Sequence, residues 1–350
     1  MTRPLFYTTT AIIAASAVAM TFAQAQVRQD GSGYTTAQIT AAHRAAPIDV
    51  HIWYPSDTAE TPVMMAENIL FNGFAAYPDA QPIGPAAPVI VFSHGSGGRA
   101  VQSGWLAAQL AAQGMIVVAP NHQGTMTQDS DPHQTPMIWQ RTQDMSAVLD
   151  ALEAGDLGGF APDMDRVAAM GFSLGGGAAL SLAGAQLSKA DFISYCAAPK
   201  GTPDCDWMQA GGVDFTQIDQ ALYEADWRDP RISGVLAIDP ALTQAMTDTS
   251  LAQMEMPVLT LGLGDAQSVP LAVDAYHLQD RLADAQHAWV PEAAHFSFLP
   301  SCGVIGKIAT AVAGDDNICS DWGLRNRDEV HGEIADHATA FFTQLFAAPS

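Results

Sequence analysis

Short apolar runs recur through the middle of the chain and alternate with stretches of helical periodicity. The continuous apolar runs are 89–92, 115–119, 167–170, 232–238 and 258–261. Runs of this length without polar alternation are typical of parallel strands that are buried on both faces. Strands that alternate with helices predict a doubly wound, mostly parallel α/β sheet.

Helices are expected between these strands. The segments with helical periodicity are 100–113, 137–153, 176–185, 271–283 and 329–346. Residues 48–54 alternate as an edge-type strand, and short strands are expected at 68–71 and 288–290. Because no repeat or linker interrupts the pattern, we expect residues 26–350 to form one domain.

The alternation breaks between residues 189 and 230. This stretch contains prolines, glycines, two cysteines and several aromatic side chains without a clear strand period. We interpret it as a lid-like insertion after the helix at 176–185. Its aromatic side chains could line an acyl or leaving-group pocket, and packing onto the body of the domain explains each of them equally well.

The segment 166–176 carries the strongest chemical signal. Its residues Gly171-Phe172-Ser173-Leu174-Gly175 fit the pattern G-x-S-x-G directly after a buried strand and before a small-residue helix. The pentapeptide alone is weak, because the chain has 29 glycines. In this context it predicts a nucleophile elbow, a sharp turn that holds the Ser173 hydroxyl clear of the sheet at a helix N-terminus.

A serine hydroxyl needs a base and a group that orients the base. His295, in the loop after the last short strand, is the expected base. Asp265 and Asp239 both follow apolar strands, whose carboxyl ends share one edge of a parallel sheet. We favour Asp265, because two glycines let its loop turn inward and about 30 residues separate it from His295. Asp239 is the alternative acid.

A glycine-rich segment follows the strand at 89–92 and reads Ser93-His94-Gly95-Ser96-Gly97-Gly98. Its glycines allow the backbone to approach a substrate closely. We predict an oxyanion hole formed by the backbone N–H of Leu174 and one N–H from Gly95 or Ser96. A flexible glycine turn is the alternative explanation of these residues.

Composition narrows the range of partners. The chain has 14 Lys plus Arg against 37 Asp plus Glu, a formal charge of −23. This charge repels phosphate backbones and anionic membranes, so no nucleic-acid partner is expected. An adaptation for solubility is enough to explain this negative charge, which then has no bearing on the substrate. On the helix at 137–153, Arg141 and Asp144 lie three positions apart and are expected to form a structural pair.

The first 25 residues resemble a signal peptide. Arg3 precedes an apolar stretch at 11–22, and Ala23-Gln24-Ala25 supplies the small residues of a cleavage site. The apolar stretch is short for a membrane span. We expect cleavage after Ala25 and an exported, periplasmic or secreted protein without stable membrane insertion. A retained N-terminal anchor is the alternative.

Four cysteines lie in the exported part, and four allow three pairings. They are Cys196, Cys205, Cys302 and Cys319. We predict the two local pairs, Cys196 with Cys205 and Cys302 with Cys319, since disulfides are favoured in an exported protein. No C-x-x-C spacing occurs, so a zinc site has no support.

The chain resembles the α/β-hydrolase superfamily, and within it the exported dienelactone-hydrolase-like proteins related to platelet-activating-factor acetylhydrolase. The blocks that carry the resemblance are Trp53-Tyr54-Pro55, Ser93-His94-Gly95-Ser96-Gly97-Gly98, Val118-Ala119-Pro120-Asn121-His122, Arg141 with Asp144, Gly171-Phe172-Ser173-Leu174-Gly175-Gly176, His295-Phe296-Ser297-Phe298-Leu299, and Cys302 with Cys319. The resemblance implies a serine esterase that hydrolyses a small carboxylic ester or lactone without a metal or organic cofactor.

Two details of the resemblance affect the interpretation. Dienelactone hydrolase itself uses a cysteine nucleophile, whereas this elbow carries Ser173, so dienelactone is not implied as the substrate. In the acetylhydrolases the acid follows the earlier strand, which keeps Asp239 a serious candidate. Two other functions stay open: an exported peptidase or amidase with the same triad, and a binding protein that has lost catalysis.

Overall fold

The structure is a computed structural model. It describes residues 31–57, 61–197, 202–265, 269–282, 285–314, 318–321 and 324–347. The predicted signal peptide at 1–25 lies outside the described residues. Within them, no helix has the length and apolar character needed to span a membrane.

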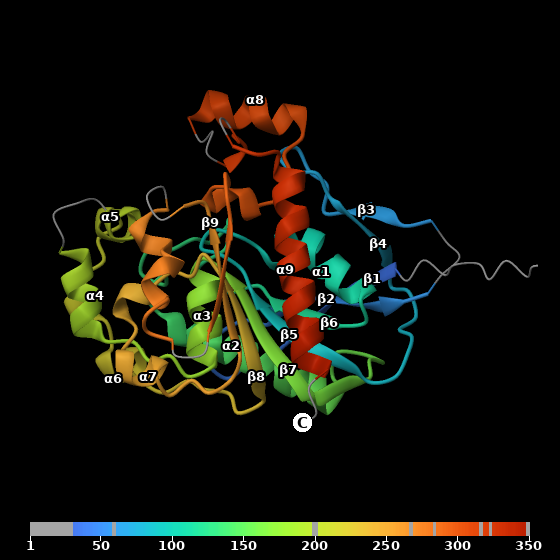
Figure 1. The fold of residues 1–350 in the computed structure, drawn as a ribbon, viewed down its shortest axis with the longest axis horizontal. Coiled ribbons are helices and arrows are strands. Elements are labelled where there is room, and N and C mark those ends of the chain that lie inside the picture. Colours follow the sequence, from blue (N-terminus) through green and yellow to red (C-terminus); the bar gives the residue numbers. More distant parts are fainter. Residues whose placement is uncertain are drawn as a thin grey trace, which may run out of the picture.

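The described residues form a ten-stranded sheet in the order β10-β9-β8-β7-β5-β6-β2-β1-β4-β3 (Figure 1). The strands are β1 Gly31–Ile39, β2 Ile48–Ser56, β3 Val63–Met65, β4 Phe74–Pro78, β5 Ala87–Ser93, β6 Ile116–Pro120, β7 Pro162–Phe172, β8 Ile232–Ile238, β9 Val258–Leu263 and β10 Gln286–Val290. The six strands β5, β6, β7, β8, β9 and β10 pair in parallel, and β2 and β1 add antiparallel strands next to β6. The predicted mostly parallel α/β sheet is confirmed.

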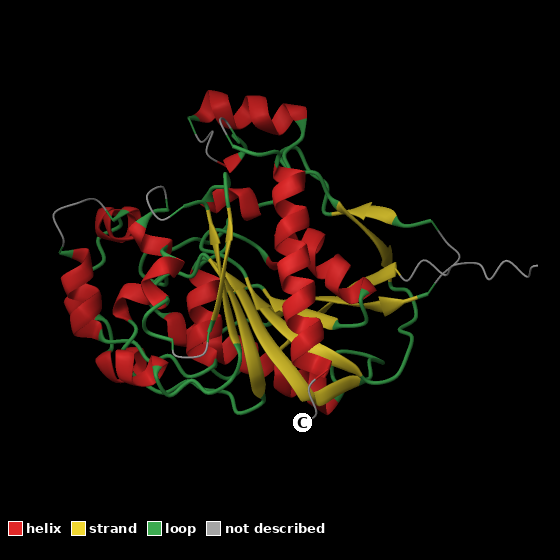
Figure 2. Cartoon of the chain, in the orientation of Figure 1, coloured by secondary structure: helices red, strands yellow, loops and turns green. Residues whose placement is uncertain are grey.

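Helices cover both faces of this sheet (Figure 2). The main helices are α1 Gly104–Ala112, α2 Ile138–Ala154, α3 Leu174–Leu182 and α9 Arg327–Ala347. α2 and α3 pack on one face, and α1 and α9 on the other. On β5, Val89 and Val91 face the first core while Ile90 and Phe92 face the second. Both faces are therefore buried, which explains the continuous apolar runs.

The stretch after α3 folds as small helices rather than as irregular chain. They are α4 Lys189–Cys196, α5 Pro203–Ala210, η2 Phe215–Gln217 and α6 Gln220–Tyr223. Phe215 and Tyr223 are buried, and their ring centroids lie 5.2 and 5.7 Å from that of Phe192. These aromatic side chains pack into the body of the domain. The lid role of the insertion stays a prediction.

Two local predictions are wrong. The expected helix at 271–283 is replaced by the 3-10 turns η4 Leu271–Val273 and η5 Ala275–Leu278. Asp274 between them is extended, and its side chain accepts a hydrogen bond from Tyr276 N, which starts a new turn and interrupts the helix. The expected strand at 68–71 is only an isolated bridge between Phe71 and Cys302.

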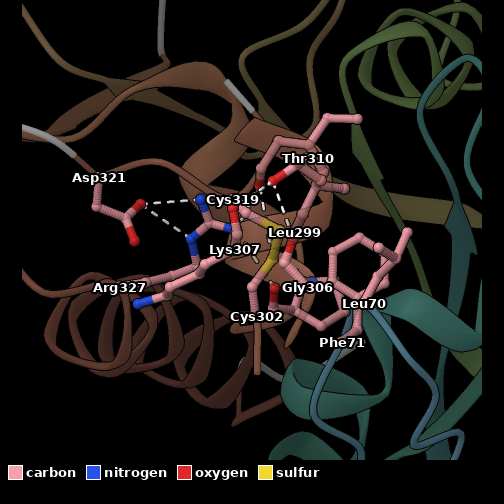
Figure 3. The surroundings of a disulfide bond; sticks show 12 residues. Leu70, Phe71, Leu299, Cys302, Gly306, Lys307, Thr310, Cys319, Asp321 and Arg327 are labelled. Carbon is pink, nitrogen blue, oxygen red and sulfur yellow. Dashed lines mark hydrogen bonds and ion pairs between the residues drawn. A yellow bond between two sulfur atoms is a disulfide. The ribbon is translucent and has the colours of Figure 1, made fainter. Parts of the chain in front are cut away.

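Both predicted disulfides are confirmed, Cys196 with Cys205 and Cys302 with Cys319. The second encloses α8 Val304–Ala313, which stands apart from the sheet at the top of Figure 1. Figure 3 shows that Gly306 faces the Leu70 backbone, where a Cβ atom would lie 2.1 Å from the carbonyl oxygen.

The side chains on the outer face of α8 are apolar. Val304, Ile305, Ile308 and Val312 are 61 to 84% exposed. On the inner side, two contacts hold the segment 302–319 that contains α8 (Figure 3). One is the disulfide, and the other is the side chain of Arg327, which donates to Asp321 at 2.9 Å and to the Ile318 carbonyl at 2.8 Å.

We expect the double variant Cys302→Ala/Cys319→Ala to lower the free energy of unfolding by about 3 kcal/mol, because the bond closes a loop of 17 residues. Urea denaturation of the variant and the wild type measures the difference. Replacing both cysteines avoids a free thiol. An unchanged denaturation midpoint would show that the segment around α8 is held without the disulfide.

Candidate active site

Ser173 sits in a backbone conformation that few L-residues adopt. Its φ is 57° and its ψ is −123°, between the end of β7 and the first residue of α3. Neighbouring backbone holds this strained turn: Ser173 N donates to Ile238 O at 2.9 Å, and Ser173 O accepts from Ala241 N at 2.9 Å. The sharp turn expected of a nucleophile elbow is therefore present.

Steric contact explains the two glycines of the motif. A Cβ atom on Gly171 would lie 2.0 Å from the carbonyl oxygen of Gly175. A Cβ atom on Gly175 would lie 1.9 Å from the carbonyl oxygen of Ser93. Real Cβ atoms do not approach oxygen this closely, so the strand and the helix can meet only through glycine.

Three side chains form a hydrogen-bonded chain at the carboxyl edge of the sheet. Ser173 Oγ lies 3.1 Å from His295 Nε2, and His295 Nδ1 lies 2.9 Å from Asp239 Oδ2. Asp239 is fully buried, and its Oδ1 accepts from Leu263 N at 2.8 Å. Burial raises the pKa of Asp239, against the lowering effect of the bonds from His295 and Leu263. An ionised Asp239 accepts the Nδ1 proton, which leaves the Nε2 lone pair facing the serine.

Our preference for Asp265 as the residue that orients His295 is wrong. His295 bonds to Asp239, the alternative, and not to Asp265, which is exposed. The register of the sheet gives the reason. β8 lies next to β7, and Ile238 pairs with Phe172 of β7, so Asp239, the residue after β8, lies close to the elbow. Asp265 belongs to the next strand along and lies farther beyond its end.

The loop that carries His295 is fixed through its carbonyl groups. His331 on α9 donates from Nε2 to the carbonyl oxygens of Ser297 and Leu299, each at 3.0 Å. Trp105 on α1 donates from Nε1 to Phe298 O at 3.0 Å, and its ring stacks on that of His331 with 3.7 Å between centroids. Two helices on one face of the sheet therefore determine where the histidine lies.

The predicted oxyanion-hole segment borders the nucleophile. A Cβ atom on Gly95 would lie 3.3 Å from the Cβ of Ser173. Leu174 N belongs to the first residue of α3, so it has no acceptor within the helix. Ser96 is exposed, one residue farther along. The backbone N–H groups of Gly95 and Leu174 are therefore our candidates for oxyanion donors, ahead of Ser96.

The expected pair between Arg141 and Asp144 is replaced by contacts with other parts of the chain. Arg141 bonds to the segment that carries Ser93 and His94, and Asp144 accepts from Arg44, His43 and His122. Sequence reasoning missed these contacts. The available signal was that both charges fall on the buried face of α2.

The described residues contain no group of three or more His, Cys, Asp or Glu side chains placed to hold a metal ion. Ser173 Oγ bonds to the imidazole of His295, which in turn bonds to the carboxylate of Asp239.

Comparisons with known proteins give the family. A family model described as X-Pro dipeptidyl-peptidase (S15 family) matches residues 46–295, a span that contains Ser173, Asp239 and His295. The chain belongs to this S15 family. A search of curated proteins finds no match.

Solved structures similar to this S15 family member are α/β-hydrolases. A ferulic acid esterase from Streptomyces cinnamoneus is 18% identical, with 93% of each chain covered and a TM-score of 0.61. A dienelactone hydrolase from Anabaena variabilis is 14% identical, with 84% of this chain and 99% of the other covered and a TM-score of 0.45. A dienelactone hydrolase-like promiscuous phosphotriesterase from metagenomic libraries is 16% identical, with 89% and 98% covered and a TM-score of 0.48. The protein is a hydrolase of the α/β-hydrolase type.

We expect Asp239→Asn to lower kcat of this S15 family member by roughly 10⁴-fold, because the asparagine favours the wrong tautomer of His295. Asp265→Asn, the matched control, should keep kcat within about threefold of the wild type, since His295 bonds to Asp239 instead. Initial rates with p-nitrophenyl acetate measure both. A severe loss in Asp265→Asn alone would contradict the hydrogen bonding of the triad.

Stability should fall as the pH is lowered from about 6.5 to about 4. Burial lowers the pKa of His51, His122 and His331 to about 4, so in this window the unfolded chain binds more protons than the folded one. Urea midpoints at pH 7, 5.5 and 4.5 measure the decline. His331→Gln should be less stable at pH 7 but decline less steeply, whereas the exposed His133→Gln should match the wild type. Parallel curves for wild type and His331→Gln would contradict this assignment.

Proposed function

We propose that this protein is a serine hydrolase that cleaves carboxylic esters or lactones through an acyl-enzyme intermediate. The observation that carries the proposal is the geometry at Ser173. Its Oγ lies 3.1 Å from His295 Nε2, and the opposite ring nitrogen is bonded to the buried Asp239. This is the arrangement that a nucleophilic serine requires.

In the first half of the reaction, Ser173 Oγ attacks the carbonyl carbon while His295 Nε2 takes the hydroxyl proton. The carbonyl oxygen becomes an oxyanion that accepts hydrogen bonds from Gly95 N and Leu174 N. Asp239 stabilises the imidazolium. His295 then gives its proton to the leaving oxygen, the carbon–oxygen bond of the ester breaks, and Ser173 keeps the acyl group.

In the second half, a water molecule takes the place of the alcohol. His295 accepts a proton from the water as its oxygen attacks the acyl carbon, and returns a proton to Ser173 Oγ when the acid leaves. With a lactone the leaving hydroxyl stays attached to the acyl chain, so the product is a single hydroxy acid.

A second candidate is a peptidase that releases dipeptides ending in proline. The family match over residues 46–295 favours it. The same triad serves both reactions, but an amide leaves as an amine and is the harder bond to break. Ester hydrolysis is therefore expected of the triad in either case, and the structural similarity to a ferulic acid esterase supports it as the main activity.

We also propose that the mature enzyme is exported, to the periplasm or the medium. The two disulfides support this location, because such bonds persist in oxidising compartments. The predicted signal peptide at 1–25 supplies the route.

Ser173→Ala should lower ester turnover by about 10³-fold or more without changing the thermal midpoint, since the triad acts as a unit. The substrate panel contains p-nitrophenyl esters from acetyl to long acyl, a feruloyl ester, lactones and an Xaa-Pro p-nitroanilide. Ser233→Ala is the control, because its hydroxyl bonds to Val167 O in the sheet, away from the elbow. A Ser173→Ala variant that keeps more than about a tenth of the wild-type rate would show that another group is the nucleophile.

The same panel separates the two candidates. A kcat/KM higher for the anilide than for every ester would favour the peptidase. A wild-type protein that hydrolyses nothing and does not react with a fluorophosphonate would be a binding protein, and the proposed function would be wrong.

A further inference from the structure

A buried guanidinium lies directly behind the oxyanion-hole segment. Arg141 on α2 is 2% exposed, so its charge is held inside the protein. Its Nη1 donates to His94 O at 2.6 Å and to Ser93 Oγ at 3.2 Å, and its Nη2 donates to Thr125 Oγ1 at 2.8 Å. A charge that is so expensive to bury needs a reason beyond packing.

The hydrogen bond from Arg141 to His94 O also fixes the direction of the neighbouring N–H group. The carbonyl of His94 and the N–H of Gly95 belong to one planar trans peptide, so they point in opposite directions. Arg141 holds the oxygen on the side of α2, and the N–H must then point to the other side. Gly95 lies against Ser173, where a Cβ atom would come within 3.3 Å of the serine Cβ.

We propose that Arg141 is a positioning residue that aims the Gly95 N–H at the oxyanion formed on the substrate of Ser173. The inference rests on the proposed function. Arg141 also acts on the strength of this donor. A guanidinium bonded to the carbonyl draws electron density from the peptide and makes the N–H a stronger donor.

The guanidinium is itself held in one orientation by a directed chain of hydrogen bonds. Burial lowers the pKa of His122 to about 4, so the ring is neutral. His122 Nδ1 donates to Asp144 at 2.8 Å, which leaves Nε2 to accept from Ser93 Oγ at 2.8 Å. Ser93 Oγ, having donated its proton, accepts from Arg141.

Asp144 anchors the far end of this chain. Burial would raise its pKa, but the hydrogen bonds from His122, His43 and Arg44 hold it well below the usual value. The carboxylate is therefore ionised and can only accept. Arg44 donates to it from Nε at 2.8 Å and from Nη2 at 2.6 Å. The protons in the chain thus have a single arrangement, and Arg141 cannot rotate without breaking it.

The peptide group that follows Gly95 is held by a hydrogen bond as well. His94 Nδ1 donates to Gly95 O at 2.8 Å, and His94 Nε2 accepts from His122 N at 3.1 Å. Burial lowers the pKa of His94, which keeps one ring nitrogen free to accept. Both carbonyls that flank the Gly95 N–H therefore have a fixed partner, as an oxyanion donor requires.

Arg141→Met tests the inference. We expect kcat for p-nitrophenyl acetate to fall roughly 10- to 100-fold, because a displaced donor loses most of its effect on the transition state. KM should change less than about threefold, since the donor acts on the oxyanion and not on the bound ester. A trifluoromethyl ketone, which forms an oxyanion when Ser173 adds to it, should bind more weakly by the same factor as kcat falls.

Arg166→Met is the matched control. Like Arg141, Arg166 donates to a backbone carbonyl, and it also bonds to the carboxylate of Asp163, in the half of β7 away from the elbow. Its replacement should lower the thermal midpoint but leave kcat and the ketone affinity unchanged. If Arg141 were only structural, Arg141→Met would behave in the same way, and that result overturns the inference.

Arg141→Lys provides a second test if Arg141→Met does not fold. A lysine keeps the charge and one bond to His94 O but not the bonds that fix its direction, so kcat and ketone affinity should fall together by a smaller factor. Wild-type values in folded Arg141→Lys overturn the inference. Before these measurements, a separate sample of the wild type is treated with a fluorophosphonate to test whether it has a reactive serine. Labelled wild type with unaffected variants contradicts only the role of Arg141, whereas unlabelled wild type contradicts the proposed function as well.

Discussion

The left-handed turn at Ser173 is the constraint on which the rest of the site depends. The turn exists because Gly171 lets β7 approach α3, and Gly175 lets α3 approach the end of β5, until a Cβ atom at either glycine would overlap a carbonyl oxygen. Ser173 N donates a hydrogen bond to Ile238 O of the neighbouring strand β8, and Ser173 O accepts one from Ala241 N, and these two bonds hold the turn. Asp239, which bonds to His295, directly follows that same strand. One contact between strands therefore sets the nucleophile and the acid relative to each other.

Much of this fold could be predicted from sequence because its signals are local. The parallel strands are buried on both faces, so each reads as a continuous apolar run, and the elbow needs glycine at fixed positions around Ser173. The disulfides join cysteines that are close in sequence. The helix expected at 271–283 does not form, because the side chain of Asp274 accepts a hydrogen bond from the backbone N–H of Tyr276. Apolar spacing does not reveal this local competition.

The choice between Asp239 and Asp265 could not be made from sequence, because it depends on the order of strands in the sheet. Both follow apolar strands and share one edge. Only the pairing of β8 with β7 brings Asp239 to His295. The contacts of Arg141 and Asp144 were missed for a related reason. Their partners lie between 16 and 101 positions away in the chain, and two charges spaced for an ion pair gave a simpler explanation.

The placement of the acid on β8 has a consequence for the connection between β9 and β10. Up to Gly264 the backbone position of this connection is fixed, because Leu263 N bonds to Asp239 and Gly264 N bonds to Val290 O. Beyond Gly264, none of the described residues before β10 bonds to the triad. Ala272, Val273, Ala275, Leu278 and Leu282 in this stretch are nevertheless buried, so packing constrains them. Only the exposed positions between them tolerate changes in sequence easily. A designer could therefore change the exposed positions while leaving Ser173, His295 and Asp239 where they are, but would have to keep the apolar residues that pack into the core.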